Sequence, residues 1–202
     1  MNTDTVRRQM VEQQIRTCDV SDASLLDILE QLPRERFVPD AYRLLAYADT
    51  EIPLAHGECM MRPSVEGQLL QALELEAEDS VLEIGTGSGY LTACLARLAG
   101  EVLSVDVYPD FLDRAGTLLD ELQIRNVTLQ QRDVIRDAFP DGRFDVIAIT
   151  GSMPTLDERL LQHLEPGGRL FVITGNAPIM EAQLILRGAD DSWHKSSLFE
   201  TL

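Results

Sequence analysis

Short apolar runs alternate with helical patterns from residue 80 onward. The apolar runs are rich in β-branched residues, which is typical of strands buried on both faces, and they cover 80–84, 102–105, 127–129, 144–149 and 170–173. Helical patterns separate them at 89–98, 110–122 and 155–164. This alternation predicts a parallel sheet covered on both sides, with ligands at the carboxyl ends of its strands. Two final runs, 182–186 and 196–199, predict an antiparallel hairpin at one edge.

The first third of the chain has a different pattern. Val6, Met10 and Ile15 lie near helical spacing, and Ser21 can cap a second helix that ends before Pro33. Prolines then interrupt the chain as far as Pro63, so residues 52–63 are expected to form an ordered loop, and Ser64 can cap the next helix. We expect one domain over 1–202, with a helical preface and loop at 1–63 and an α/β core at 64–202.

Three alternating glycines follow the first predicted strand directly, in the stretch Gly85-Thr86-Gly87-Ser88-Gly89-Tyr90. Glycine lets the backbone turn sharply and lets a ligand approach without meeting a Cβ. A dinucleotide fingerprint would need a glycine where Tyr90 stands, so a nicotinamide or flavin cofactor is disfavoured. Asp106 ends the next strand, where a carboxylate can accept hydrogen bonds from both hydroxyls of a ribose. Together these features predict a nucleoside ligand.

Charge, hydrophobicity and cysteine content argue against several classes of partner, site and location. The 202 residues include 17 basic and 34 acidic side chains, giving a formal net charge of −17, so a nucleic-acid partner is not expected. No apolar run approaches the roughly 18 residues of a membrane-spanning helix, and the start lacks the apolar core of a secretory signal. The three cysteines are far apart, which argues against a disulfide framework or a metal site and favours the reducing cytoplasm.

The form acidic-x-Gly-x-Gly-x-Gly, with Glu83 at the strand end, resembles the first motif of S-adenosylmethionine-dependent methyltransferases. This resemblance implies a three-layer, Rossmann-like α/β fold, S-adenosylmethionine as cofactor and S-adenosylhomocysteine as product. In that superfamily the glycine loop wraps the methionine part of the cofactor, and an acidic residue at the place of Asp133 lies near the adenine. The implied cofactor-binding residues are Glu83, Gly85, Thr86, Gly87, Ser88, Gly89, Asp106, Val107, Asp133, Val134 and Thr150. No metal is implied.

Further stretches resemble one branch of the superfamily closely, the protein-L-isoaspartate O-methyltransferases, which methylate a carboxylate of damaged aspartyl residues and so begin their repair. The matching stretches are 10–15, 32–39, 52–54, the pair His56-Gly57 and the glycine loop. The resemblance covers nearly the whole chain. It implies that residues 52–63 form a substrate loop, that residues 64–202 bind the cofactor, and that the substrate is a protein or peptide with an isoaspartyl carboxylate.

The substrate loop differs from the family pattern, which usually reads Gln-Thr-Ile-Ser-x-Pro after the His-Gly pair. Here Cys59 replaces the threonine and Met61 replaces the serine. In the family the hydroxyls of that threonine and serine lie at the methyl-transfer site. A thioether accepts hydrogen bonds weakly and donates none, so the acceptor could instead be a small acidic molecule, or the protein could bind the cofactor without turnover. The candidate catalytic residues are His56, Cys59 and Met61. A structural role is the alternative for His56, and Arg62 could pair with an acidic substrate or be solvated.

Overall fold

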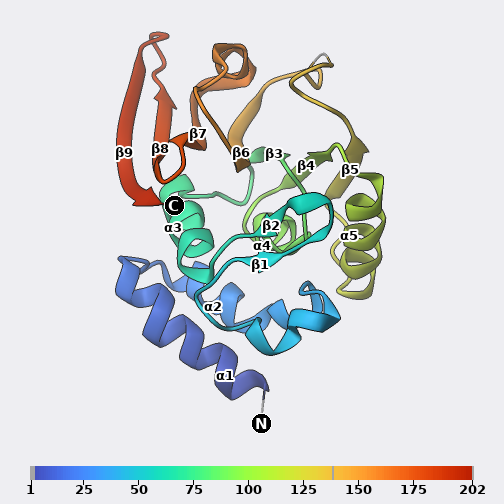
Figure 1. The fold of residues 1–202 in the computed structure, drawn as a ribbon. Helices are drawn as coiled ribbons and strands as arrows, with labels where there is room; N and C mark the ends of the chain where they lie inside the picture. The colour runs from blue at the N-terminus through green and yellow to red at the C-terminus, as the bar shows by residue number, and fades with distance from the viewer. Residues whose placement is uncertain (1–2, 138, 202) are drawn as a thin grey trace.

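The computed structural model describes residues 3–137 and 139–201, and its centre is a seven-stranded sheet of order β5-β4-β3-β6-β7-β8-β9 (Figure 1). The strands are β3 (Ser80–Ile84), β4 (Glu101–Asp106), β5 (Val127–Gln131), β6 (Phe144–Met153), β7 (Leu164–Asn176), β8 (Ile179–Arg187) and β9 (Trp193–Thr201). Strands β3 to β7 run parallel to one another, whereas β8 is antiparallel to both β7 and β9. The predicted parallel sheet with an antiparallel edge is confirmed.

Alternate residues of the central strands belong to two separate hydrophobic cores. Val81 of β3 pairs with Val146 of β6, and both belong to the larger core. Leu82 and Ile147, the next pair along, belong to the other core. Successive side chains of a strand point to opposite faces, so continuously apolar strands require cover on both sides.

Three helices lie beside the sheet: α3 (Pro63–Leu73) contacts β7, α4 (Tyr90–Leu98) contacts β4, and α5 (Pro109–Glu121) contacts β4 and β5. The prediction of a helix over 155–164 is wrong, because only a 3₁₀ helix, η6 (Glu158–His163), forms there. Pro154 and Pro166 bound the segment, and its tighter 3₁₀ turns bury Leu160 in the smaller core.

The N-terminal segment is helical, as predicted, and packs onto the core of the sheet. α1 (Thr3–Met10) continues through a π-helical turn, η1 (Val11–Ile15), into η2 (Arg16–Cys18), and α2 (Ala23–Gln31) follows. Figure 1 shows these elements in blue, and Met10 and Ile15 share the larger core with Val81. No helix in the described part of the chain is long and apolar enough to cross a membrane.

Both predicted helix caps are displaced by one residue or more. α2 is capped by Asp22 rather than Ser21, since the Asp22 carboxylate accepts a hydrogen bond from the Leu25 amide at 2.7 Å. α3 starts at Pro63, whose fixed φ suits a first helical position. Ser64 therefore lies inside α3, and its hydroxyl donates to Asp49.

The proline-rich segment is ordered, as predicted, through 3₁₀ turns and a short two-stranded ribbon. Its turns are η3 (Arg34–Arg36), η4 (Asp40–Leu45) and η5 (Ala55–Gly57). β1 (Ile52–Pro53) pairs antiparallel with β2 (Cys59–Met60), and η5 connects them. In Figure 1 this ribbon crosses in front of the sheet, and the cavities described below place it against the carboxyl ends of β3 and β6.

Candidate functional site

A cavity of about 240 Å³ opens at the carboxyl ends of β3, β4, β5 and β6. Its walls are formed by Glu58, Cys59, Ile84, Gly85, Gly87, Val105, Asp106, Val107, Tyr108, Phe111, Arg132, Asp133, Val134, Ile135, Ile149, Thr150, Gly151, Ser152 and Met153. The chain runs outward from β3 through β4 to β5 and then returns to β6 on the other side of β3. Such a reversal of strand order separates the loops that follow neighbouring strands, which is where open α/β sheets bind ligands.

The glycine loop fits this cavity for two different steric reasons. Gly85 has a φ of +101°, and a Cβ at this position would lie 2.2 Å from the Thr150 hydroxyl oxygen. That hydroxyl lies within hydrogen-bonding distance of the carbonyl oxygens of Ile84 (3.0 Å) and Gly85 (2.7 Å), which fixes the turn. At Gly87 a Cβ would meet only Leu54, at 3.6 Å. The contact with Thr150 therefore requires glycine at 85, whereas at 87 it is the left-handed φ of +50° that favours glycine.

The Asp106 carboxylate is held in one orientation at the cavity wall. One oxygen accepts a hydrogen bond from the Gly87 amide at 2.9 Å, and the other accepts from the Tyr108 amide at 3.0 Å. Each carboxylate oxygen retains a further acceptor position, so two neighbouring hydroxyls of a ligand can bind there. The side chain is buried in the protein alone, so these hydrogen bonds preform the site.

At the far end of the cavity, apolar side chains flank a second carboxylate. Val107, Val134 and Ile135 line the cavity together with Asp133, and Val107 and Ile135 remain 42% and 75% exposed. Asp133 accepts hydrogen bonds from the Ile135 and Arg136 amides at 3.0 and 3.2 Å. Exposed apolar groups beside a fixed acceptor suit a flat heteroaromatic ring that carries an amino group.

The predicted contact of Glu83 with the ligand is not supported, because Glu83 lies beneath the glycine loop. Its Oε2 accepts hydrogen bonds from the Thr92 and Ser104 hydroxyls, both at 2.5 Å, so it joins α4 to β4. Burial raises the pKa of the Glu83 carboxyl to about 8. The Glu83 carboxyl is therefore uncharged at neutral pH and lies in the core, where it supports the glycine loop and does not form part of the cavity wall.

The other loop residues also lie outside the main cavity. The Thr86 hydroxyl is 2.6 Å from that of Ser104, and Ser88 accepts a hydrogen bond from the Tyr90 amide at the start of α4. Both line a much smaller cavity of about 40 Å³ together with Met61. A Cβ on Gly89 would lie 2.7 Å from that of Ala115, so glycine there allows α5 to pack closely.

His56 joins the substrate loop to the start of α5. Its Nε2 lies 3.0 and 3.1 Å from the two carboxylate oxygens of Asp110, and its ring stacks on Tyr108 with centroids 4.0 Å apart and planes 4° from parallel. The side chain is outside the lining of the main cavity. This placement favours the structural alternative for His56 over a catalytic role.

Cys59 and Met61 face the region where an acceptor can approach. Cys59 lines the main cavity, and both residues line an adjoining cavity of about 260 Å³. Burial, with the carboxylates of Glu51 and Glu58 nearby, raises the pKa of the Cys59 thiol. The thiol therefore stays protonated at neutral pH, which makes Cys59 part of a wall rather than a nucleophile.

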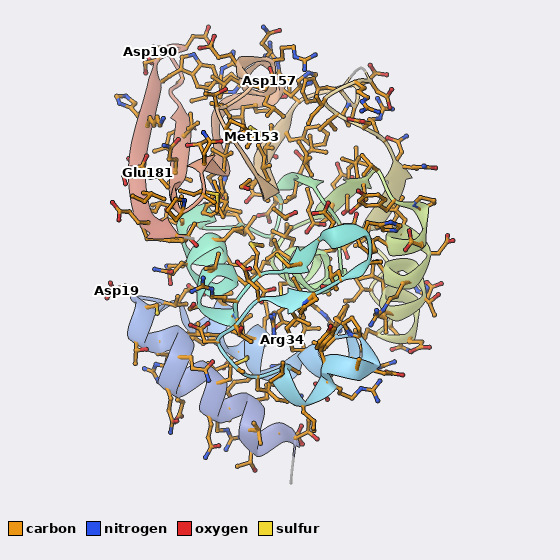
Figure 2. All side chains as sticks on the ribbon, viewed as in Figure 1. Asp19, Arg34, Met153, Asp157, Glu181 and Asp190 are labelled. Carbon is orange, nitrogen blue, oxygen red and sulfur yellow. The ribbon has the colours of Figure 1, made fainter. Side chains whose placement is uncertain are left out.

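A buried arginine holds the substrate loop in place. Arg34 is fully buried, forms an ion pair with Glu66 of α3, and packs 4.8 Å from the centre of the Tyr90 ring. Its guanidinium also donates to the carbonyl oxygen of Met61 at 2.7 Å. Figure 2 shows Arg34 where the blue N-terminal segment meets the cyan ribbon. The N-terminal segment thus determines where the loop lies.

The sequence pattern did not identify several lining residues. Tyr108 and Phe111 were detectable in principle, because they follow Asp106 at a strand end where ligands bind. Ser152 and Met153 were not, since the apolar pattern ends at 149 whereas β6 continues to Met153, which Figure 2 labels beside the upper part of the sheet.

Comparison with known proteins gives a consistent result. The family model described as Protein-L-isoaspartate(D-aspartate) O-methyltransferase (PCMT) matches residues 5–201. A protein-L-isoaspartate O-methyltransferase of Anaeromyxobacter dehalogenans is 40% identical over 173 residues, which cover 85% of this chain and 83% of that protein. One of Rhodopseudomonas palustris is 35% identical over 193 residues, covering 96% and 89%. The crystal structure of a Plasmodium falciparum β-aspartate methyltransferase (PCMT) in complex with S-adenosyl-L-homocysteine matches in fold, with a TM-score of 0.83 at 20% identity over 97% and 95% of the two chains.

Proposed function

Since the chain belongs to the protein-L-isoaspartate(D-aspartate) O-methyltransferase family, we propose that its main cavity binds S-adenosylmethionine and that residues 52–63 present an isoaspartyl carboxylate to it. The chain is an S-adenosylmethionine-dependent methyltransferase, and its family acts on proteins that contain isoaspartyl residues. The observation that carries the assignment of residues is the cavity itself, which combines the glycine loop, Asp106 and the substrate loop.

Each part of the cofactor has matching groups in the cavity. The backbone of Gly85 and Gly87 leaves room for the methionine part, and the Asp106 carboxylate accepts hydrogen bonds from the ribose hydroxyls. Val107 and Val134 would flank the adenine, and Asp133 would accept a hydrogen bond from its amino group. Thr150 holds the glycine turn in shape. Glu83, Thr86, Ser88 and Gly89 support this site from beneath.

When bound, S-adenosylmethionine supplies an electrophilic methyl group that an ionised carboxylate oxygen can accept directly. A general base is therefore unnecessary, since the acceptor carboxylate is already ionised at neutral pH. The task left to Cys59, Met61 and Thr150 is to orient the acceptor and exclude water. His56 contributes by fixing the loop to Asp110.

We treat residues 1–63 and 64–202 as one methyltransferase domain. Met10, Ile15 and Leu29 of the preface lie in the same core as Val81 and Leu95. The preface also supplies Arg34, which donates to the Met61 carbonyl oxygen and so connects this segment to the loop.

Methylation of capped peptides tests the proposed function. One peptide carries an isoaspartyl residue, its twin carries normal aspartate, and a panel of small carboxylic acids is assayed in parallel. We expect ester formation on the isoaspartyl peptide alone. Transfer to a small acid but not to the peptide, or tight cofactor binding without any transfer, would contradict the proposal.

The double variant Cys59→Thr/Met61→Ser tests the role of the loop. It restores the hydroxyls that the family resemblance places at these positions, and hydroxyl donors can orient a carboxylate that a thioether cannot. We expect faster methylation of the isoaspartyl peptide with unchanged affinity for S-adenosylhomocysteine. Slower methylation would mean that backbone groups of the loop, rather than side-chain hydroxyls, hold the acceptor.

A further inference from the structure

Two further cavities continue from the cofactor cavity along the surface. The first, of about 260 Å³, shares Cys59, Thr150 and Ser152 with the cofactor cavity, and Met180 and Thr201 form part of its opposite wall. The second, of about 440 Å³, lies between α3 and the ends of β8 and β9. Both cavities are lined by Arg62, Val65 and Thr201. Arg62 therefore lies where the acceptor region meets an outer groove.

The charges along these cavities make Arg62 distinctive. Glu51 and Glu58 line the inner cavity and Glu200 lines the outer one, whereas Arg62 is the one basic residue that the described part of the chain contributes to either lining. The chain as a whole has a formal net charge of −17. An anionic acceptor that approaches the cofactor is repelled by these carboxylates unless a cation lies on its path.

The Arg62 side chain is available to a ligand, unlike that of Arg34, the buried arginine behind the substrate loop. Its side chain is partly buried, yet it makes no hydrogen bond or ion pair within residues 3–137 and 139–201. By contrast, the guanidinium of Arg34, which is buried against the substrate loop, is paired with Glu66. A guanidinium has five N–H donors in a planar fork that matches a carboxylate.

From these observations we infer that Arg62 is a specificity-determining residue that binds the isoaspartyl carboxylate of the acceptor peptide. The inference rests on the proposed function and adds the group that recognises the acceptor. When the fork donates one N–H to each carboxylate oxygen, each oxygen keeps a second lone pair, with which one of them can accept the methyl group. The cation thus supplies a strong donor, whereas the Met61 thioether has none and the Cys59 thiol only a weak one.

Substitution of Arg62 changes only its side-chain chemistry. The structural role of the residue is carried by its backbone, since its carbonyl oxygen accepts the hydrogen bond of the Glu66 amide at the start of α3. Its φ of −64° and ψ of 146° are open to any residue. Arg62→Gln is therefore expected to fold, and Arg62→Lys keeps the charge but loses the fork.

The test uses an acetylated and amidated peptide whose only carboxylate is that of the isoaspartyl residue. We expect Arg62→Gln to raise KM, and the Kd of the peptide for the protein bound to S-adenosylhomocysteine, by roughly tenfold to a hundredfold. Arg62→Lys should fall between Gln and wild type. Raised salt should weaken peptide binding to the wild type more than to Arg62→Gln. Arg16→Gln, which removes the same charge at an exposed site outside these cavities, should match the wild type.

The possible failures are distinguishable. If the wild type methylates the peptide and Arg62→Gln leaves KM and peptide Kd unchanged, the inference about Arg62 is wrong and the proposed function stands. If Arg62→Gln also weakens binding of S-adenosylhomocysteine, the residue has a structural role and the inference is again wrong. If the wild type neither binds nor methylates the peptide, the proposed function fails and the inference fails with it.

Discussion

The Thr150 hydroxyl occupies the space that a side chain on Gly85 would need, since an ideal Cβ there would lie 2.2 Å from the Thr150 oxygen. Gly85 directly follows β3 and Thr150 lies on the neighbouring strand β6, and the same hydroxyl lies 2.7 Å from the Gly85 carbonyl oxygen. The turn that opens the cofactor cavity is thus determined by a contact between strands as well as by the glycine pattern itself.

This contact predicts the effect of Gly85→Ala. Both the steric clash and the φ of +101° oppose a side chain, so we expect a loss of roughly 1–3 kcal/mol in stability and at least a tenfold weaker affinity for S-adenosylhomocysteine. Calorimetry and urea unfolding measure the two effects. Gly142→Ala is a matched control, because Gly142 has the same φ of +101° but no atom within 4 Å of the added Cβ. Equal cofactor affinities in the two variants would disprove the steric argument.

The role of Asp106 is tested by Asp106→Asn. The amide keeps one acceptor oxygen but loses the charge, so we expect cofactor affinity to fall by about 1.5–3 kcal/mol, roughly tenfold to a hundredfold. Titration calorimetry with S-adenosylhomocysteine measures the change. Asp113→Asn, on the exposed side of α5, serves as the control. An affinity within error of the wild type would show that the ribose binds elsewhere.

The buried Glu83 predicts a pH dependence of stability. Its pKa in the folded protein, about 8, lies above the ordinary value of 4.5, so the folded state binds this proton more tightly than the unfolded chain. The resulting stabilisation is complete below about pH 4.5 and is lost as pH rises toward 8, by roughly 3 kcal/mol between pH 5.5 and 8. Glu83→Gln should remove that slope in urea unfolding, whereas Glu101→Gln on the surface should keep it. Parallel slopes for wild type and Glu83→Gln would contradict the assignment.

The Arg34–Glu66 ion pair predicts a strongly non-additive pair of substitutions. Arg34→Leu alone leaves the Glu66 carboxylate buried without its partner, so we expect a loss of about 3–5 kcal/mol. The double variant Arg34→Leu/Glu66→Leu should recover a substantial part of this loss, because no unpaired charge remains. It should still raise the KM for the isoaspartyl peptide, since the hydrogen bond to the Met61 carbonyl is gone. Additive losses in thermal unfolding would mean that the two residues act independently.

The sequence by itself determined the sheet and the centre of the cofactor site. Runs of β-branched apolar residues separated by helices predict the strands of a parallel sheet, and the run of glycines into α4 marks the ligand-binding turn. The expected burial on both faces holds for β3 but not for β5, which is partly exposed at the edge of the sheet. Gly85, Gly87 and Asp106 all line the cavity because the carboxyl ends of neighbouring parallel strands meet at one edge. These features depend on the local sequence pattern and on the general geometry of parallel strands, so they can be predicted from a single sequence.

Only the tertiary structure decided what individual polar side chains do. Glu83 matches the acidic position of the glycine motif, yet its carboxyl accepts hydrogen bonds from Thr92 and Ser104 in the core. His56 pairs with Asp110, 54 positions further along the chain. Arg34 reaches the Met61 carbonyl across 27 positions. A charged side chain is accepted in the interior only where packing brings it a partner, and that partner can come from any part of the chain. The spacing of residues in the sequence therefore does not predict these contacts, which form only when the N-terminal segment, the ribbon and the sheet pack together.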